Sequence, residues 1–270
     1  MPFFKELREI ASIAQLLEEV ETVIPPQDYR FDSIYLRGQA FYDWTLRPTI
    51  ARPLEYAGLR TDGYDKNREL YLLHRFRRYV RPLVEDFAEK ELLLLARHHG
   101  IPVRLLDWTK SPLVALYFAC VEDRWLGEDG AVWAFVRCQH QHDYFYDFFT
   151  DPRPLFDLPG VKIIYAPYVS LRIPAQSANF TIQQHPDRDL ETYGTAGCGK
   201  DFDIERIVKW RIPKHRKTDL LQALERCGVN EKTMFPDLDG IARGINRTEV
   251  LQTGRPKSTT NSKTPPRTCS

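Results

Sequence analysis

Residues 131–136 have the sequence AVWAFV, a run of apolar and aromatic side chains that predicts a buried β-strand. Upstream, Pro112 stands where the first turn of a helix tolerates proline, and an apolar helix is predicted over residues 113–121. Downstream, β-branched and aromatic residues predict further strands over residues 161–169, 180–183 and 204–212. The middle of the chain therefore supplies a helix and several strands that can share one core.

Helical patterns flank these strands on both sides. Apolar residues recur at helical spacing over residues 5–21, 65–80 and 83–98, and again over 216–227 and 237–247. One early strand, residues 34–36, ends at a glycine turn. This irregular order favours the α+β class, with a single domain over residues 5–250 whose helical N-terminal half packs on a mixed or antiparallel sheet. Residues 253–270 lack an apolar cluster, so we expect a disordered tail there.

Composition excludes several classes of protein. The 270 residues include 38 basic and 37 acidic ones, and the net charge of +1 gives no bulk reason to expect nucleic acid, although it leaves room for a local basic patch. No apolar run approaches the roughly 18 residues of a membrane-spanning helix, so we expect no membrane association. The five cysteines are scattered and form no CxxC pair, which fits a protein of the reducing cytoplasm.

The first polar cluster lies at the end of the early strand. Arg37 and Gly38 place a guanidinium beside a tight turn, and such a planar set of donors binds carboxylates or phosphates. Gly38 would let a backbone or a ligand approach closely, with Gln39 beside it. The alternative, which the residue types alone favour, is that Arg37 pairs with an internal carboxylate and braces the fold.

The second polar cluster runs from the end of one predicted helix to the start of the next. His98 and His99 stand at a helix C-terminus, where negative potential favours a protonated imidazole. Asp107, Thr109 and Ser111 precede the helix that starts at Pro112, so they can cap its free amides or leave them to an anionic ligand. Ordinary capping is the simpler interpretation.

Other motifs predict no chemistry. The residues Cys138, His140, His142 and Asp143 alternate as metal ligands could, but no strong further ligand accompanies them, so we expect no metal site. The chain has no phosphate-binding G-x-x-x-x-G-K-[ST] loop and no G-x-S-x-G nucleophile turn.

Several segments together resemble a known family. They are Leu36-Arg37-Gly38-Gln39, the string from His98-His99-Gly100 to Asp107-Trp108-Thr109, Arg172 with Gln176 and Phe180, and Phe235-Pro236-Asp237. In this order they resemble the FRG domain, a family named for a Phe-Arg-Gly motif, and the likeness spans about residues 30–245. Leu36 takes the place of the phenylalanine, and Arg97 stands where glutamine is usual.

A weaker similarity to ADP-ribosyltransferase folds implies a function. Arg37, Thr109, Ser111 and Gln176 carry that similarity. Together with the FRG resemblance it implies one pocket in which Arg37, Gly38, Gln39, Arg104, Thr109 and Ser111 would bind a nucleotide such as NAD, and His98, His99, Asp107 and Gln176 would be catalytic. Arg37 and Arg104 would hold phosphates, Asp107 would orient a histidine, and Gln176 would contact ribose. The family's distribution implies a role in toxin or phage-defence systems.

Two other readings of the same residues stay open. The protein can be a non-catalytic module that binds a nucleotide, a nucleic acid or a protein partner. The polar residues can also form a network that only specifies the fold. These readings differ in whether Arg37, His99, Asp107 and Gln176 face one open cavity.

Overall fold

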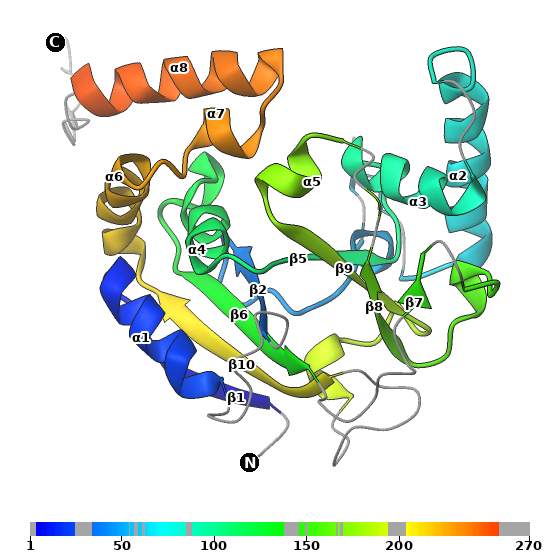
Figure 1. Cartoon of the computed structure of the whole chain (residues 1–270), viewed down its shortest axis with the longest axis horizontal. Coiled ribbons are helices and arrows are strands. Elements are labelled where there is room, and N and C mark those ends of the chain that lie inside the picture. The colour runs from blue at the N-terminus through cyan, green and yellow to red at the C-terminus, as the bar shows by residue number, and fades with distance from the viewer. Residues whose placement is uncertain are drawn as a thin grey trace, which may run out of the picture.

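The computed structural model describes residues 4–24, 34–53, 55–56, 59–60, 63–84, 88–137, 146–148, 151–165, 167, 170–193 and 204–253. The strands of the main sheet are β1 (Phe4–Glu9), β2 (Ile34–Gln39), β5 (Leu105–Thr109), β6 (Gly130–Arg137), β7 (Tyr146–Asp147), β8 (Val161–Tyr165), β9 (Ala178–Gln183) and β10 (Ile204–Ile212). Among the described residues these eight strands lie in the order β1-β10-β6-β2-β5-β9-β8-β7 (Figure 1). The β1–β10 and β7–β8 pairs are parallel and the others antiparallel, so the sheet is mixed.

Helices surround the sheet and confirm the α+β class. They are α1 (Ile13–Val23), α2 (Lys66–Val80), α3 (Glu89–His98), α4 (Pro112–Cys120), α5 (Arg172–Ala175), α6 (Lys217–Arg226), α7 (Glu231–Met234) and α8 (Leu238–Thr253). Strands β3 (Glu55–Tyr56) and β4 (Leu59–Arg60) pair with each other and form a separate two-stranded sheet. Short 3₁₀ turns lie at Thr49–Ala51, Asp123–Trp125, Leu155–Asp157, Leu190–Thr192 and Lys214–Arg216.

Strand β6 is the centre of the core, as its apolar sequence predicts. It pairs with β10 on one side and with β2 on the other, and all its residues up to Val136 are buried. Successive side chains of a strand point to opposite faces of the sheet. Val132 and Ala134 therefore join one apolar cluster, and Trp133 and Phe135 join another.

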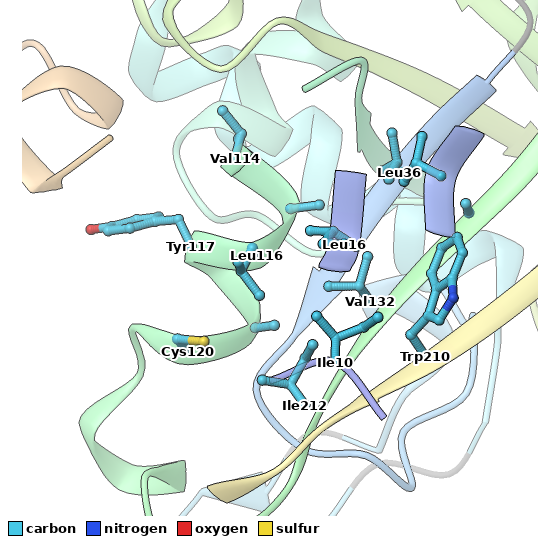
Figure 2. Close-up of a cluster of buried hydrophobic side chains, with 14 of the residues drawn as sticks. Ile10, Leu16, Leu36, Val114, Leu116, Tyr117, Cys120, Val132, Trp210 and Ile212 are labelled. Carbon is cyan, nitrogen blue, oxygen red and sulfur yellow. The ribbon is translucent and has the colours of Figure 1, made fainter. Parts of the chain in front are cut away.

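Helices α1, α4 and α6 cover the face that carries Val132. Leu16 of α1, Val132 of β6 and Trp210 of β10 point into the same apolar space (Figure 2). Helix α4 is apolar on nearly all sides and is mostly buried, which suits its place between the sheet and α6. This packing fixes α4 against the end of β2.

A third apolar cluster anchors α2 and α3 beside β5 and β9. Leu73 of α2 and Leu93 of α3 share it with Phe180 and Ile182 of β9. Because α3 is held in this way, its C-terminal end lies next to Asp107 of β5. The packing thus brings the two polar clusters of the sequence together.

The expected helix over residues 5–21 is wrong in its first part. Residues Phe4–Glu9 form β1, which pairs in parallel with β10, and the helix begins only at Ile13 after the Ser12 cap. The pattern of β1 is poor in apolar residues because this edge strand exposes most of its side chains. Backbone pairing with β10 stabilises this strand, and the pattern of its own side chains does not predict it.

The remaining elements follow the predictions with shifted ends. The helix expected over 83–98 begins at Glu89, and the strand expected over 161–169 ends at Tyr165. Strand β5 and the short helices α5 and α7 were not predicted. Helix α8 extends to Thr253, and the rest of the expected tail lies outside the described residues.

Two observations concern membranes and metals. In the described part of the chain, no helix combines the length and the apolar composition needed to cross a bilayer. The described residues also contain no group of three or more His, Cys, Asp or Glu side chains that could hold a metal ion. The cluster from Cys138 to Asp143 lies outside them.

Candidate functional site

A cavity of about 440 Å³ opens where the end of β2, the C-terminal end of α3, and β5 meet α4 and α5. Its polar lining residues are Arg37, Gln39, Arg52, Arg97, His98, Asp107, Thr109, Glu122, Arg172 and Gln176. Its largest apolar lining side chains are those of Trp44, Trp108, Phe118, Phe180 and Phe235. Residues that lie far apart in the sequence therefore share one hollow.

Asp107 lies at the charged centre of the cavity, between two arginines. Arg97 donates from Nε to Oδ1 and Oδ2 of Asp107 at 3.0 and 3.1 Å, and its Nη2 is in closer contact with Oδ2. Arg37 donates from Nη1 to the Asp107 carbonyl at 2.8 Å and lies 3.5 Å from Oδ2. Burial raises the pKa of Asp107, but the two guanidinium groups outweigh it and bring the pKa to about 2. Asp107 is therefore ionised at neutral pH and is a poor general base.

Arg37 carries its charge in a largely buried position. Burial lowers its pKa to about 10, Arg52 and Arg97 lower it as well, and Asp107 partly compensates. Its Nε is buried and has no hydrogen-bond partner among the described residues. Arg37 therefore braces Asp107, as the structural alternative predicts, and also has a donor left over.

Acid should weaken the protein through Asp107. A carboxyl whose folded pKa lies below the ordinary 3.8 stabilises the fold above that value, and the stabilisation is lost as pH falls from about 4 towards 2. We expect Asp107→Asn to lower the free energy of unfolding by about 1–2 kcal/mol at neutral pH, after allowance for solvent at this one-third exposed side chain. Urea unfolding of both proteins between pH 7 and 2.5 measures this difference, which should shrink with acid. A difference that stays constant with pH would contradict the assignment.

His98 belongs to the cavity and is held by a serine. Its Nδ1 lies 3.2 Å from Ser170 Oγ. Burial, His99 and Arg172 lower its pKa, so the imidazole is neutral at physiological pH rather than protonated as its helix-end position predicts. The hydrogen bonds found for Asp107 go to arginines, so the expectation that Asp107 orients a histidine is wrong.

Three of the predicted site residues do not line the cavity. Arg104 is 2% exposed and pairs with Glu69, with 3.0 Å between Nε and Oε2. It precedes Asp107 by an odd number of residues, so an extended chain turns the two side chains to opposite sides. His99 lies against Phe76, and Ser111 accepts from the Val114 amide at 3.4 Å as an ordinary helix cap.

The other predicted residues line the cavity but are tied to the fold. Gln176 donates to the Met234 carbonyl at 2.9 Å, and its own carbonyl accepts from Thr109 at 2.7 Å. Gln39 is buried between the Thr45 carbonyl and the Trp133 indole. These side chains shape the cavity walls, and Gly38 lies where β2 passes closest to α4.

Sequence reasoning missed most of the positive charge. Arg97 was seen only as a departure from the family pattern, Arg172 was quoted in a matching segment without a role, and Arg52 was given no role. Arg52 donates to the Arg47 carbonyl at 2.9 Å and stands over the Trp44 ring. Arg172 pairs with Asp237, with 2.8 Å between Nε and Oδ2. The signal that could have found Arg97 and Arg172 is the recurrence of arginine within or beside three of the four matching segments.

The model of the FRG domain family matches residues 32–125, the stretch that holds Arg37, Arg97 and Asp107. The resemblance is thereby confirmed over these residues, while its extension to about residue 245 and the similarity to ADP-ribosyltransferases stay predictions. No curated protein matches the chain, and no solved structure matches it either.

Proposed function

The chain carries an FRG domain, and from this premise we propose that the cavity of the domain binds a phosphate-bearing nucleotide, with NAD as the first ligand to test. The observation that supports this most is that Arg37, Arg52 and Arg97 line one cavity together with Asp107, which pairs directly with Arg37 and Arg97. One carboxylate compensates one guanidinium, and the surplus positive charge favours an anionic guest.

The balance of charge extends over the whole lining. Four arginines line the cavity, against the carboxylates of Asp107 and Glu122 in the lining and of Asp237, which pairs with Arg172. A guanidinium group can donate two hydrogen bonds to one phosphate. In a partly desolvated cavity water competes less effectively for these hydrogen bonds than at an open surface.

Size and aromatic content also suit a nucleotide. The volume of about 440 Å³ lies within the range of roughly 300–1,000 Å³ that is usual for small-ligand sites. Trp44, Phe118 and Phe235 provide flat apolar surfaces against which a base or a nicotinamide ring can pack. A free inorganic anion would leave these surfaces unused.

The second candidate is an enzyme that consumes NAD, as the weaker similarity implies, and a neutral His98 in the cavity favours it. The bond between nicotinamide and ribose would break, water would bond to the ribose carbon, and its proton would pass to His98. Nicotinamide would leave as a neutral molecule. Gln176 cannot act as a carboxylate, so we favour this hydrolysis over transfer to a protein. The toxin or phage-defence setting stays a prediction.

Calorimetric titration tests the proposal. We expect NAD, ADP-ribose or ADP to bind the wild-type protein, and adenosine, which has no phosphate, to bind at least 10-fold more weakly. Arg37→Gln and Arg52→Gln should each weaken nucleotide binding by about 10-fold or more, since a hydrogen bond to a charged group contributes about 1.5–3 kcal/mol. Arg226→Gln removes the same charge from an exposed position on α6 and should change little.

The outcomes separate the readings. If no nucleotide binds the folded wild-type protein, or if Arg226→Gln weakens binding as much as Arg37→Gln, the nucleotide proposal is wrong. Release of nicotinamide from NAD that His98→Asn abolishes without loss of binding would support the enzyme, while binding without release would favour a non-catalytic module. Thermal unfolding of each variant shows whether it is folded.

A further inference from the structure

Helix α2 has a buried side and an opposite side that is strongly basic. Glu69, Leu73 and Val80 lie on the buried side. The α2 basic face consists of three exposed arginines on the other side: Arg75, Arg78 and, at the cap, Arg81. Arg77, also exposed, borders the buried side. Two exposed tyrosines stand among them, Tyr71 at 60% and Tyr79 at 73% exposure. Figure 1 shows α2 at the margin of the molecule, beside α3.

No acidic side chain balances this face in the part of the chain that the structure describes. Glu69, the acidic residue within α2, is buried and pairs with Arg104. None of the ion pairs among the described residues involves an arginine of the α2 basic face. A solvated helix surface usually mixes both signs of charge, and this surface does not.

Repulsion between the arginines of the α2 basic face destabilises helix α2. Arg75 and Arg78, and likewise Arg78 and Arg81, are three residues apart, so their like charges are neighbours on the helix surface and repel. Bound polyanion would remove this repulsion and release counterions on binding. From Tyr71 to Arg81 the helix rises about 15 Å, enough to follow several phosphates of a single strand.

We propose that the α2 basic face binds single-stranded nucleic acid. The arginines contact backbone phosphates, and the exposed rings of Tyr71 and Tyr79 stack on bases, which single strands present and duplexes hide. Arg75 already stands 5.6 Å from the centre of the Tyr71 ring, a pairing of cation and ring that such sites use. The chain's balanced net charge does not oppose this, because the surplus is local. The proposal is independent of the nucleotide cavity.

Fluorescence anisotropy with labelled oligothymidylate and oligouridylate of about 20 nucleotides tests the proposal. We expect binding that weakens steeply between about 50 and 200 mM salt. The triple variant Arg75→Gln/Arg78→Gln/Arg81→Gln should lose at least 10-fold in affinity, and its slope against the logarithm of salt should fall by about 2. Glutamine and arginine are similar helix formers, so α2 should persist, which circular dichroism checks.

A matched control and a stacking variant sharpen the test. Lys5→Gln/Lys214→Gln/Arg226→Gln changes the charge equally at exposed positions outside α2 and should change affinity less than 2-fold. Tyr71→Ser/Tyr79→Ser should reduce the preference for a single strand over a duplex of equal length.

Three results would overturn the proposal. One is the absence of binding at low salt, and another is equal loss of affinity in both triple variants. The third is tighter binding to polyglutamate or to vesicles of phosphatidylcholine and phosphatidylserine than to the oligonucleotides, which would assign the face to an acidic protein or a membrane.

Discussion

Replacing Glu69 with alanine is expected to lower the free energy of unfolding by about 3–5 kcal/mol, because it leaves a buried guanidinium without its carboxylate. Glu69 is fully buried and accepts from Nε of Arg104 at 3.0 Å and from the Arg104 amide at 2.8 Å. Tyr64 donates to the same carboxylate at 3.1 Å, and Phe156 covers the guanidinium. Water cannot replace these contacts, so the charge stays uncompensated.

The control for this prediction is an exposed ion pair on α6. Arg216 and Asp219 are 3.0 Å apart and partly exposed, so Asp219→Ala should cost no more than about 1 kcal/mol. The double variant Glu69→Leu/Arg104→Met should lose much less than the sum of the single changes, since it removes both charges together. Urea unfolding gives all these values. Equal costs for Glu69→Ala and Asp219→Ala would contradict the prediction.

The strands and helices of the core could be predicted because their patterns are local. Strand β6 and the proline-started helix α4 can each be recognised from an apolar pattern within about ten residues. Strand β1 does not, because its stability comes from pairing with β10, about two hundred residues later in the chain. The local pattern of side chains does not reveal a pairing partner so far away in the chain.

Some residues of the candidate site could be predicted from the sequence and others could not. Resemblance to the FRG domain brought Arg37 and Asp107 together correctly, although no local pattern connects them. It placed Arg104 in the cavity wrongly, because a shared motif records which residues recur and not which side of the chain they face. The parity of spacing between Arg104 and Asp107 carried that information. Arg97, the residue that departs from the family pattern, turned out to hold Asp107 most closely.

Replacing Gly38 with alanine is expected to cost about 3 kcal/mol, near the upper end for overpacking a core. A Cβ at Gly38 would lie 1.9 Å from the Ala115 carbonyl oxygen and 2.6 Å from the Ala119 nitrogen. Both atoms belong to the backbone of α4, which cannot yield without moving the whole helix off the sheet. The glycine of the motif is thus required by close packing between β2 and α4, and a ligand is not needed to explain it.

Gly127 provides the matched control for this change. A Cβ there would meet no heavy atom of the described residues within 4 Å, so Gly127→Ala should alter the free energy of unfolding by no more than about 0.5 kcal/mol. Urea unfolding compares the two variants. If Gly38→Ala is as stable as Gly127→Ala and loses only nucleotide binding, the glycine serves the ligand and not the packing. The packing argument predicts the reverse: Gly38→Ala is destabilised, and the fraction that remains folded at low temperature still binds. The arginine and the glycine of the motif would then have separate roles. Arg37 contributes positive charge to the cavity, and Gly38 lets α4 pack closely enough on β2 to form one wall of the cavity.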